Sequence, residues 1–535
     1  MAAIVYQTDK RSGITYAYES VSHWDKEKQQ SRAKRTLIGR VDAKTGEIIP
    51  TRKKARQETT NKPKRGPVPF TDVSRDFFGA TYLFDSIGEK TGITDDLKKC
   101  FPDIYKQILS IAYYLILEDK NPLSRFPRWA SLHKHPCGKD ISSQRSSELF
   151  ASIREEERYQ FFRLQGKRRT EQEYWAYDTT SLSSYSKCLK QVRYGVNKED
   201  EPLPQINLAL LFGEKSNLPF YYRKLPGNIP DVKTIKNLLA DMDFLEYKKI
   251  KLVMDRGFYS EDNINGLYQN HLKFLIATKL NLKFVKTELN KVRESLRTWT
   301  NYNQKYELYA CSSMINWSYS QNRPYKGDTL ESEHRMYLHI YFNSENAMED
   351  EKEFNNLLCK LQSELESGRR NPENEKLYTK YFDMKSTPVR GAKVIARQEA
   401  IDEAKRNYGY FALVSNEIKD PIEALEIYRN KDLVEKAFGN LKERLNLRRM
   451  AVSSDASLDG KLFVEFVALI YLSYIKKKMQ EKDLYKKYTM QELLDEFDII
   501  ECFEQPGHGL RVGEVTKRQS GLYDAMGIAP PTSLQ

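Results

Sequence analysis

The stretch from Gln205 to Ser260, QINLALLFGEKSNLPFYYRKLPGNIPDVKTIKNLLADMDFLEYKKIKLVMDRGFYS, decides the fold class of this chain. QINLALLFG and LPFYYRKLPG are apolar runs joined by the polar turn EKSN, which predicts a β-hairpin. DVKTIKNLLADMDFLEY has apolar residues at helical spacing, and KIKLVMD is a continuous apolar run typical of a buried strand. EYWAYDTTSLSSYS precedes them as a further strand. The chain therefore predicts an α/β core with the order strand, strand, strand, helix, strand.

Two aspartates belong to strands of this core. Asp178 lies in WAYDTTS, and Asp255 ends the apolar strand KLVMD. The order of elements places both on neighbouring central strands, as in a ribonuclease-H-like fold. An ionised carboxylate at the end of an apolar strand needs a partner or a metal, because burying it alone is costly. We therefore expect the two aspartates to share one site.

A third carboxylate, Glu435, lies in the late stretch YRNKDLVEKAFGNLK. If this stretch is one α-helix that advances about 100° per residue, one narrow face carries Tyr428, Lys431, Glu435 and Lys442. Two interpretations explain this pattern. One is a solvated face with ion pairs, and the other is a site that holds metal and phosphate together. Three carboxylates can hold two divalent ions, which activate a water or a 3′-hydroxyl for phosphodiester chemistry. Mg2+ is the expected ion because all the ligands are hard carboxylates, and Mn2+ can substitute.

These motifs resemble those of the DDE transposases of bacterial insertion sequences. The late helix is similar to the signature Y-x2-R-x3-E-x6-K, with Lys431 where Arg is expected. Lysine keeps the charge but loses bidentate phosphate binding. WAYDTTSLSSYS resembles the first-Asp motif, MDRGFYS the second, and LPGNIPD the G-N-x-x-D element. The 180 residues between Asp255 and Glu435 resemble the subgroup with a strand-rich insertion before its catalytic Glu.

The resemblance implies a role for each of these residues. Asp178, Asp255 and Glu435 would be the catalytic metal ligands. The DNA phosphates near the transposon end would be contacted by Tyr428, Lys431, Lys442 and Arg256.

Three further residues have competing interpretations. Similar enzymes stack a flipped base on a tryptophan of the insertion, so Trp299 and Trp317 are candidates, with core packing as the alternative. Asp231 is either an accessory residue or a turn or helix cap.

The resemblance also implies the substrate and the partners. The substrate is double-stranded DNA, as the terminal inverted repeats of the element and as the target. Cleavage at the ends is followed by strand transfer, by a cut-and-paste route. Two ends must be brought together, so a homodimer on DNA is expected in the bacterial cytoplasm, at the nucleoid.

The patterns outside the core predict further modules. Residues 1–69 hold short alternating strands, such as ITYAYES, and a basic linker, RKKARQETTNKPKR, with seven bases against one acid. This linker is either a solvated charge run or an arm that contacts a nucleic-acid backbone. Residues 70–170 are helical, as a packing domain or a DNA-binding domain. The remaining modules are the two core parts, 171–280 and 409–480, the β-rich insertion between them, 281–408, and a tail, 481–535.

Composition limits the partners. Lys and Arg total 87 against 74 Asp and Glu, and the formal net charge of +13 favours an anionic partner, either nucleic acid or a membrane surface. No apolar run approaches the roughly 20 residues that span a bilayer, and the first residues have no apolar signal core. The six cysteines form no CxxC pair, so reduced thiols in a cytoplasm are expected.

Two alternatives to transposition remain open. A nuclease of the same fold would cut DNA without joining it, so strand-transfer products discriminate between the two. A domesticated DNA-binding protein would bind DNA without metal-dependent cleavage. The intact acidic triad argues against this alternative, because drift removes residues that no longer have a function.

Overall fold

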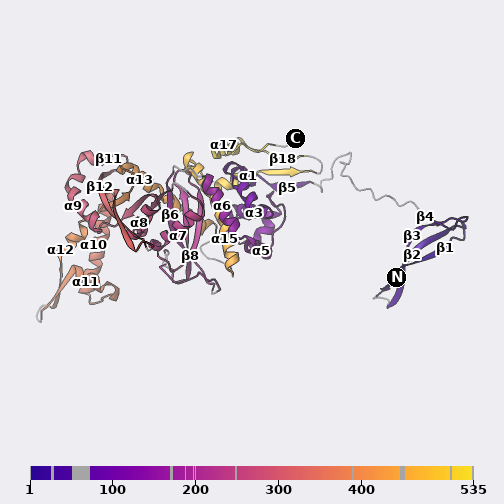
Figure 1. The fold of residues 1–535 in the computed structure, drawn as a ribbon, viewed down its shortest axis with the longest axis horizontal. Helices are drawn as coiled ribbons and strands as arrows, with labels where there is room; N and C mark the ends of the chain where they lie inside the picture. Colours follow the sequence, from indigo (N-terminus) through magenta and orange to yellow (C-terminus); the bar gives the residue numbers. More distant parts are fainter. Residues whose placement is uncertain are drawn as a thin grey trace. The chain divides into compact units, whose positions relative to one another are not determined.

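The computed structural model describes residues 2–25, 29–50, 73–168, 173–186, 188–196, 198, 201–247, 250–323, 325–387, 391–445, 452, 454–505 and 509–532. They divide into two compact units, Met1–Val73 with Gln505–His508, and Ser74–Glu504 with Gly509–Gln535. The smaller unit is a four-stranded antiparallel sheet of β1 (Ala2–Thr8), β2 (Thr15–Asp25), β3 (Gln30–Val41) and β4 (Ile48–Pro50) (Figure 1). The basic linker predicted at 52–65 lies outside the described residues.

A nine-stranded sheet forms the centre of the larger unit. Its order is β11-β12-β13-β16-β10-β9-β6-β7-β8. The five core strands are β6 (Trp175–Ser183), β7 (Gln205–Gly213), β8 (Pro219–Pro226), β9 (Lys251–Met254) and β10 (Lys273–Thr278). β6, β9 and β10 are parallel, whereas β7 runs antiparallel to both of its neighbours. This order and these directions confirm the predicted α/β, ribonuclease-H-like core.

Helices cover both faces of this sheet. Consecutive residues of β8 face opposite helices: Tyr221 donates a hydrogen bond to Asp241 of α7 (Asp231–Phe244), and Tyr222 packs on Phe466 of α15 (Asp455–Glu481). Every residue of β6 and β7 is buried. Burial on two sides explains why residues 208–212 of β7, LALLF, are all apolar and do not alternate.

The helices that precede the core are α1 (Gly79–Thr91), α2 (Ile93–Cys100), α3 (Tyr105–Leu117), α4 (Phe126–Ala130), α5 (Ser143–Ser152) and α6 (Glu155–Arg168). Of these, α1, α3 and α5 pack on α15, and Phe162 of α6 contacts Phe466 of α15. Gly460 of α15 lets α5 approach closely, because a Cβ there would lie 2.0 Å from the Phe150 carbonyl oxygen. The described residues of this segment, 73–168, are mostly helical and act here as a packing layer, while their DNA-binding role stays a prediction.

The C-terminal residues return to these helices. β17 (Glu501–Glu504) pairs with β5 (Ser74–Phe77) and with β18 (Arg511–Val512). α16 (Met490–Asp498) and α17 (Lys517–Met526) complete the segment, and Tyr523 donates a 2.8 Å hydrogen bond to the Gly79 carbonyl oxygen. No helix among the described residues is long and apolar enough to cross a bilayer.

The strands between β10 and α13 (Pro421–Asn430) extend the central sheet. β12 (Leu308–Arg323) and β13 (Asp328–Asn343) form a long hairpin, and β13 pairs with β16 (Tyr410–Ser415). β11 (Tyr302–Asn303) is the edge strand, and α9 (Lys283–Leu296) packs on the hairpin. The predicted insertion thus shares its sheet with the core.

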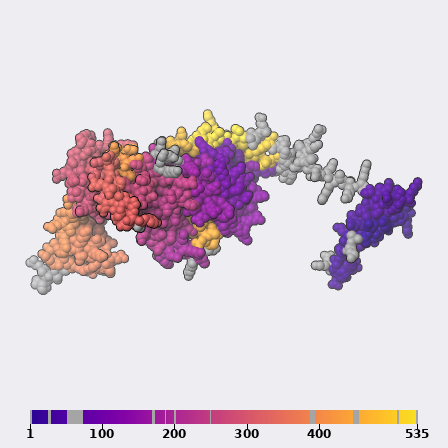
Figure 2. Space-filling view, viewed as in Figure 1, coloured from indigo at the N-terminus to yellow at the C-terminus, as the bar shows by residue number. Residues whose placement is uncertain are grey.

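A second, small hydrophobic core lies in the rest of the insertion. It includes Phe354, Leu361 and Tyr381 and forms the orange lobe of Figure 2. The elements around it are α10 (Ser344–Glu366), α11 (Glu375–Tyr381), β14 (Phe382–Thr387), β15 (Gly391–Ala396) and α12 (Gln398–Lys405). The insertion therefore contains helices as well as the predicted strands.

Candidate active site

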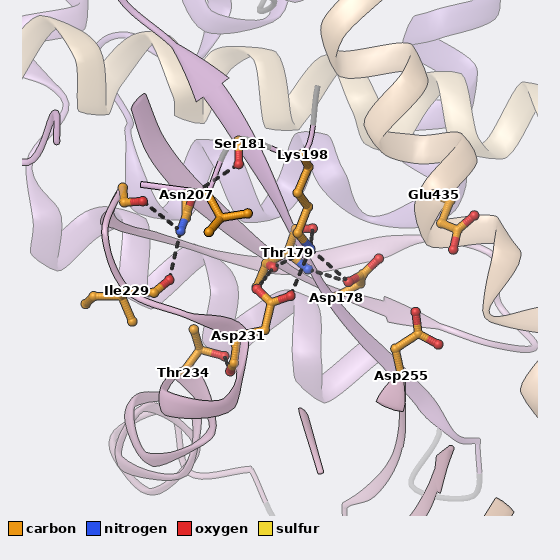
Figure 3. Close-up of polar contacts among 12 residues, drawn as sticks. Asp178, Thr179, Ser181, Lys198, Asn207, Ile229, Asp231, Thr234, Asp255 and Glu435 are labelled. Atoms are coloured by element: carbon orange, nitrogen blue, oxygen red, sulfur yellow. Dashed lines mark hydrogen bonds and ion pairs between the residues drawn. The ribbon is translucent and has the colours of Figure 1, made fainter. Parts of the chain in front are cut away.

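Strand register brings the two predicted aspartates together. Tyr177 of β6 pairs with Met254 of β9 in a parallel arrangement, so Asp178 and Asp255 come next on the two adjacent strands. Asp178 is only 8 % exposed, whereas the Asp255 side chain, after the last residue of β9, is 38 % exposed. In Figure 3 the carboxylates of Asp178, Asp255 and Glu435 lie around a common space.

The late segment is not the single helix that the spacing predicted. α13 (Pro421–Asn430) ends before Lys431, α14 (Asp432–Gly439) follows, and a π-helical turn occupies Asn440–Arg444. At the junction, the Lys431 amide donates a hydrogen bond to the Tyr428 carbonyl oxygen, and the Val434 amide donates one to the Lys431 carbonyl oxygen. Both hydrogen bonds join residues three positions apart, whereas those of an α-helix join residues four positions apart.

Tertiary contacts at the junction account for this difference. Asn430 donates to Glu214, while the next residue, Lys431, turns to the acidic site. Two consecutive side chains are thus held by different partners on the core. A continuous ideal helix would not bring both side chains within reach of these partners. Lys442 lies in the π-helical turn, where the advance per residue differs from 100°, so its place on the same face does not follow from spacing.

Lys431 lies among the three carboxylates. Its Nζ is 3.4 Å from Asp255 Oδ2 and 3.3 Å from Glu435 Oε1, and the residue is 2 % exposed. Burial lowers the pKa of Lys431, but the charges of Asp255, Asp178 and Glu435 outweigh it and hold the pKa above its ordinary value. The Lys431 side chain is therefore a buried ammonium paired with the acidic site.

Tyr428 binds the same site from α13. Its hydroxyl donates a hydrogen bond to Asp255 Oδ1. Burial and then the Asp255 charge raise the pKa of Tyr428, so the phenol stays protonated and remains a donor. Tyr428 and Lys431 thus hold the two oxygens of one carboxylate.

The Asp178 carboxylate is held from the opposite side. Its Oδ1 accepts a 2.7 Å hydrogen bond from the Thr179 amide and lies 3.8 Å from Lys198 Nζ. Burial raises the pKa of Asp178 to about 6, against the opposing effects of Lys198, Lys431 and the Thr179 amide. Asp178 is therefore fixed in orientation before any ligand binds.

A polar network connects Asp178 to the LPGNIPD element (Figure 3). Lys198 Nζ lies 3.1 Å from Asp231 Oδ2 and donates to the Thr179 carbonyl oxygen at 2.6 Å. The Thr179 hydroxyl donates to Asp231. Asn207 anchors the loop by donating a 3.0 Å hydrogen bond to the Ile229 carbonyl oxygen. Asp231 is the first residue of α7 and acts here as an ion-pair partner.

Lys198 and Thr179 were not among the predicted site residues. Thr179 follows Asp178 directly, so its contact was implicit in the motif. Lys198 lies in a polar loop between β6 and β7, and no spacing in the sequence marks it. The contact depends on how that loop folds back over β6.

The residues predicted to contact DNA differ in how exposed they are and in what they contact. Trp299 is 81 % exposed and stacks on Tyr302 with ring centroids 5.3 Å apart. Trp317 is 8 % exposed and donates a 2.8 Å hydrogen bond to Asn265, so in this structure it packs in the core, as the alternative had it. Arg256 is exposed beside Asp255.

A groove of about 1000 Å³ opens beside Asp255 and Tyr428. Its wall carries the bases Arg256, Lys279 and Arg429, the acids Glu349 and Asp350, and four amide side chains, Asn281, Asn343, Asn346 and Asn407. The groove runs from the acidic site to β13 and α10 of the insertion, so it borders both the carboxylates and the inserted segment.

The donor set of the site fits a divalent ion such as Mg2+, because all three carboxylates supply hard oxygen atoms. Within the described ranges, no three His, Cys, Asp or Glu side chains are arranged to hold one metal ion. At this site the Lys431 ammonium contacts Asp255 and Glu435, at 3.4 Å and 3.3 Å from their carboxylate oxygens. Asp178, Asp255 and Glu435 would be the ligands once that ammonium moves.

Disrupting the Lys198–Asp231 pair is expected to slow chemistry without affecting substrate binding. In Asp231→Asn or Lys198→Met, Asp178 loses its fixed orientation, and we expect cleavage about 10-fold slower, equivalent to ~1.4 kcal/mol. Single-turnover cleavage and a gel shift measure the two effects. Lys236→Met, at an exposed position of α7, is the matched control. An equal loss in the control, or no loss in either variant, contradicts the positioning role.

Comparison with known proteins places this geometry in a family. The family described as the transposase DDE domain matches residues 176–471, more than half of the 535 residues. No curated protein matches the chain. A solved structure of the piggyBac transposase synaptic complex with hairpin DNA is similar, with 11 % identity, coverage of 78 % of this chain and 70 % of that chain, and a TM-score of 0.31. The family match includes Asp178, Asp255 and Glu435, and the chain belongs to the DDE transposase family.

Proposed function

We propose that this protein is a DNA transposase that cleaves the ends of its own element and joins them to target DNA. The observation that carries the proposal is the convergence of Asp178, Asp255 and Glu435 on one buried cation, Lys431. Acidic side chains from two adjacent strands and a late helix would supply the oxygen ligands for divalent ions. The family match, which spans all three residues, supports the same chemistry.

Divalent ions, Mg2+ by preference, would activate a water or a 3′-hydroxyl and stabilise the leaving oxygen when they are bound. The residues of the chain supply the framework for that step. β6 and β9 hold Asp178 and Asp255 in register, and the Thr179 amide fixes the Asp178 carboxylate. Tyr428 and Lys431 lie beside Asp255, where both can reach a DNA phosphate.

The bases around the site favour a DNA backbone as the substrate. Arg256, Lys279 and Arg429 line the groove beside Asp255, and Lys442 lies in the π-helical turn after α14. Basic side chains that contact phosphates supply the sequence-independent part of DNA binding. The exposed Trp299 is the candidate of the insertion for stacking on a base.

We also propose the finer assignments that the motifs suggest. These are membership of the bacterial insertion-sequence subgroup with the Y-R-E-K signature, a cut-and-paste route, terminal inverted repeats as the bound DNA, and a homodimer on DNA.

Excision of the element from a plasmid tests the proposal. The gene is cloned with its native flanking DNA, and precise loss of the element is measured for wild type, Asp178→Asn and Glu435→Gln. Glu423→Gln, at an exposed position of α13, is the matched control. Excision is expected in wild type and in the control only.

Other outcomes point to other functions. Cut ends without joined products would replace transposition by nuclease activity. DNA binding without cleavage in any variant would favour a binding protein. A circular or copied element without donor loss would retain the chemistry and overturn the cut-and-paste route.

A further inference from the structure

The Lys431 ammonium bonds the same oxygens that a metal ion would need. It lies 3.4 Å from Asp255 Oδ2 and 3.3 Å from Glu435 Oε1, and 5.8 Å from the centre of the Tyr428 ring. Asp178 also attracts it. The side chain reaches this position from the junction of α13 and α14, where the helix is broken.

Without a cation, this site would be unstable in its present geometry. Like charges a few ångströms apart in a partly buried space repel strongly, because the local dielectric is well below that of water. Glu435 is 58 % exposed and belongs to a different element from Asp255, so repulsion would turn it towards solvent. Lys431 is the cation that holds Glu435 beside the strands.

A divalent ion and Lys431 cannot bind the same pair of carboxylates at once. The ion must displace the ammonium from Asp255 and Glu435. The displaced ammonium then needs another anion, because Lys431 is 2 % exposed and burying it unpaired is costly. A DNA phosphate that enters the adjacent groove beside Asp255 is such an anion.

We propose that Lys431 is a positioning residue that acts as an internal counter-ion, holding Asp255 and Glu435 together until a divalent ion and a DNA phosphate replace it. This inference rests on the proposed function and adds to it the order in which cations occupy the site: Lys431 first, and then the divalent ion together with DNA. Metal binds weakly to the protein alone and more tightly once DNA is present. Linkage requires the converse as well, so that metal strengthens the binding of DNA to the same degree.

The test is a metal-binding isotherm, measured with Mn2+ by electron paramagnetic resonance on the full chain. Lys431→Met keeps the length of the side chain and removes the ammonium. We expect it to bind Mn2+ at least about 10-fold more tightly than wild type in the absence of DNA, a change of ~1.4 kcal/mol. Lys436→Met is the matched control, because it removes the same charge from an exposed position of α14, the helix that follows Lys431.

Adding a DNA duplex that carries the end of the element gives the second readout. DNA is expected to tighten Mn2+ binding about 10-fold in wild type and in Lys436→Met, and about 2-fold or less in Lys431→Met, whose internal competitor is already gone. Lys431→Gln is the second variant, and thermal melts show which variants are folded. Agreement of the folded variants with both expectations supports the counter-ion role.

Three results would overturn the inference. They are an unchanged Mn2+ isotherm in Lys431→Met and Lys431→Gln, an equal gain in Lys436→Met, and a DNA effect that survives the loss of Lys431. In each case, cleavage by wild type would leave the proposed function intact. By contrast, Mn2+ binding that is unchanged in both Asp178→Asn and Glu435→Gln would remove the metal site itself, and the proposed function with it.

Discussion

Asp178→Asn is expected to lower the rate of DNA cleavage at least about 1000-fold while leaving DNA binding in the absence of divalent ions unchanged. Asn has nearly the same shape, so the buried position in β6 tolerates it, but it cannot supply the negative charge that a divalent ion needs. A 1000-fold loss corresponds to ~4 kcal/mol of transition-state stabilisation. Single-turnover cleavage of end DNA measures the rate, and a gel shift measures the binding.

Two comparisons make this result specific. Asp255→Asn and Glu435→Gln should cause losses of the same order, because the three carboxylates act as a unit and their effects are not additive. Asp231→Asn, one contact further from the site, should lower the rate of cleavage by about 10-fold or less, at most about a third of the Asp178→Asn loss on a logarithmic scale. Cleavage by Asp178→Asn within 10-fold of wild type would remove Asp178 from the metal site.

Glu465→Gln is expected to stabilise the protein at alkaline pH and to have little effect at acid pH. Glu465 is 1 % exposed within α15, and its nearest cation is Lys461 Nζ at 3.7 Å. Among the described residues, neither carboxylate oxygen has a hydrogen-bond partner. Burial raises the pKa of Glu465 to about 8, an effect that Lys461 opposes.

The sign follows from linkage. The unfolded carboxyl releases its proton near its ordinary pKa of 4.5, whereas the folded one keeps it up to about 8. Between these values the native state binds more protons, so the free energy of unfolding falls as pH rises. Gln cannot ionise and avoids this loss. We expect the variant to exceed wild type by roughly 2–4 kcal/mol at pH 9.

Urea unfolding at pH 5 and at pH 9 checks this expectation. Glu481→Gln is the matched control, since Glu481 lies at the exposed end of the same helix and its hydrogen bond with Lys478 lowers its pKa. The control should keep the wild-type pH profile. A wild-type profile that is flat from pH 5 to pH 9 would show that the Glu465 carboxylate gains a partner when it ionises.

Local pattern was sufficient to predict the core. The hairpin of β7 and β8, helix α7 and strand β9 were confirmed at the segments named from apolar spacing. This success has a physical reason. Strands buried on two faces must be apolar throughout, and a helix on their surface must be apolar along one stripe. The order of these elements then leaves few ways to build a sheet, and it brings Asp178 beside Asp255.

The details of the site depended on contacts between distant parts of the chain. The helix break at Lys431 coincides with bonds from Asn430 to Glu214 and from Lys431 to Asp255, which local spacing does not contain. In the π-helical turn at Asn440–Arg444, Arg444 donates to Gln491, a similarly distant partner. The burial of Trp317 depends on Asn265, 52 residues away. The joining of β13 to β16 decides that the insertion continues the central sheet.

The sequence by itself thus determined the α/β core, its order of elements and the three carboxylates. Only the tertiary structure decided what lies between them: the Lys431 ammonium, and the Lys198–Asp231 pair behind Asp178. The physical reason is the range of the interactions. Apolar periodicity records which face of an element is buried, whereas the partner of a buried charge depends on which distant segment folds against it.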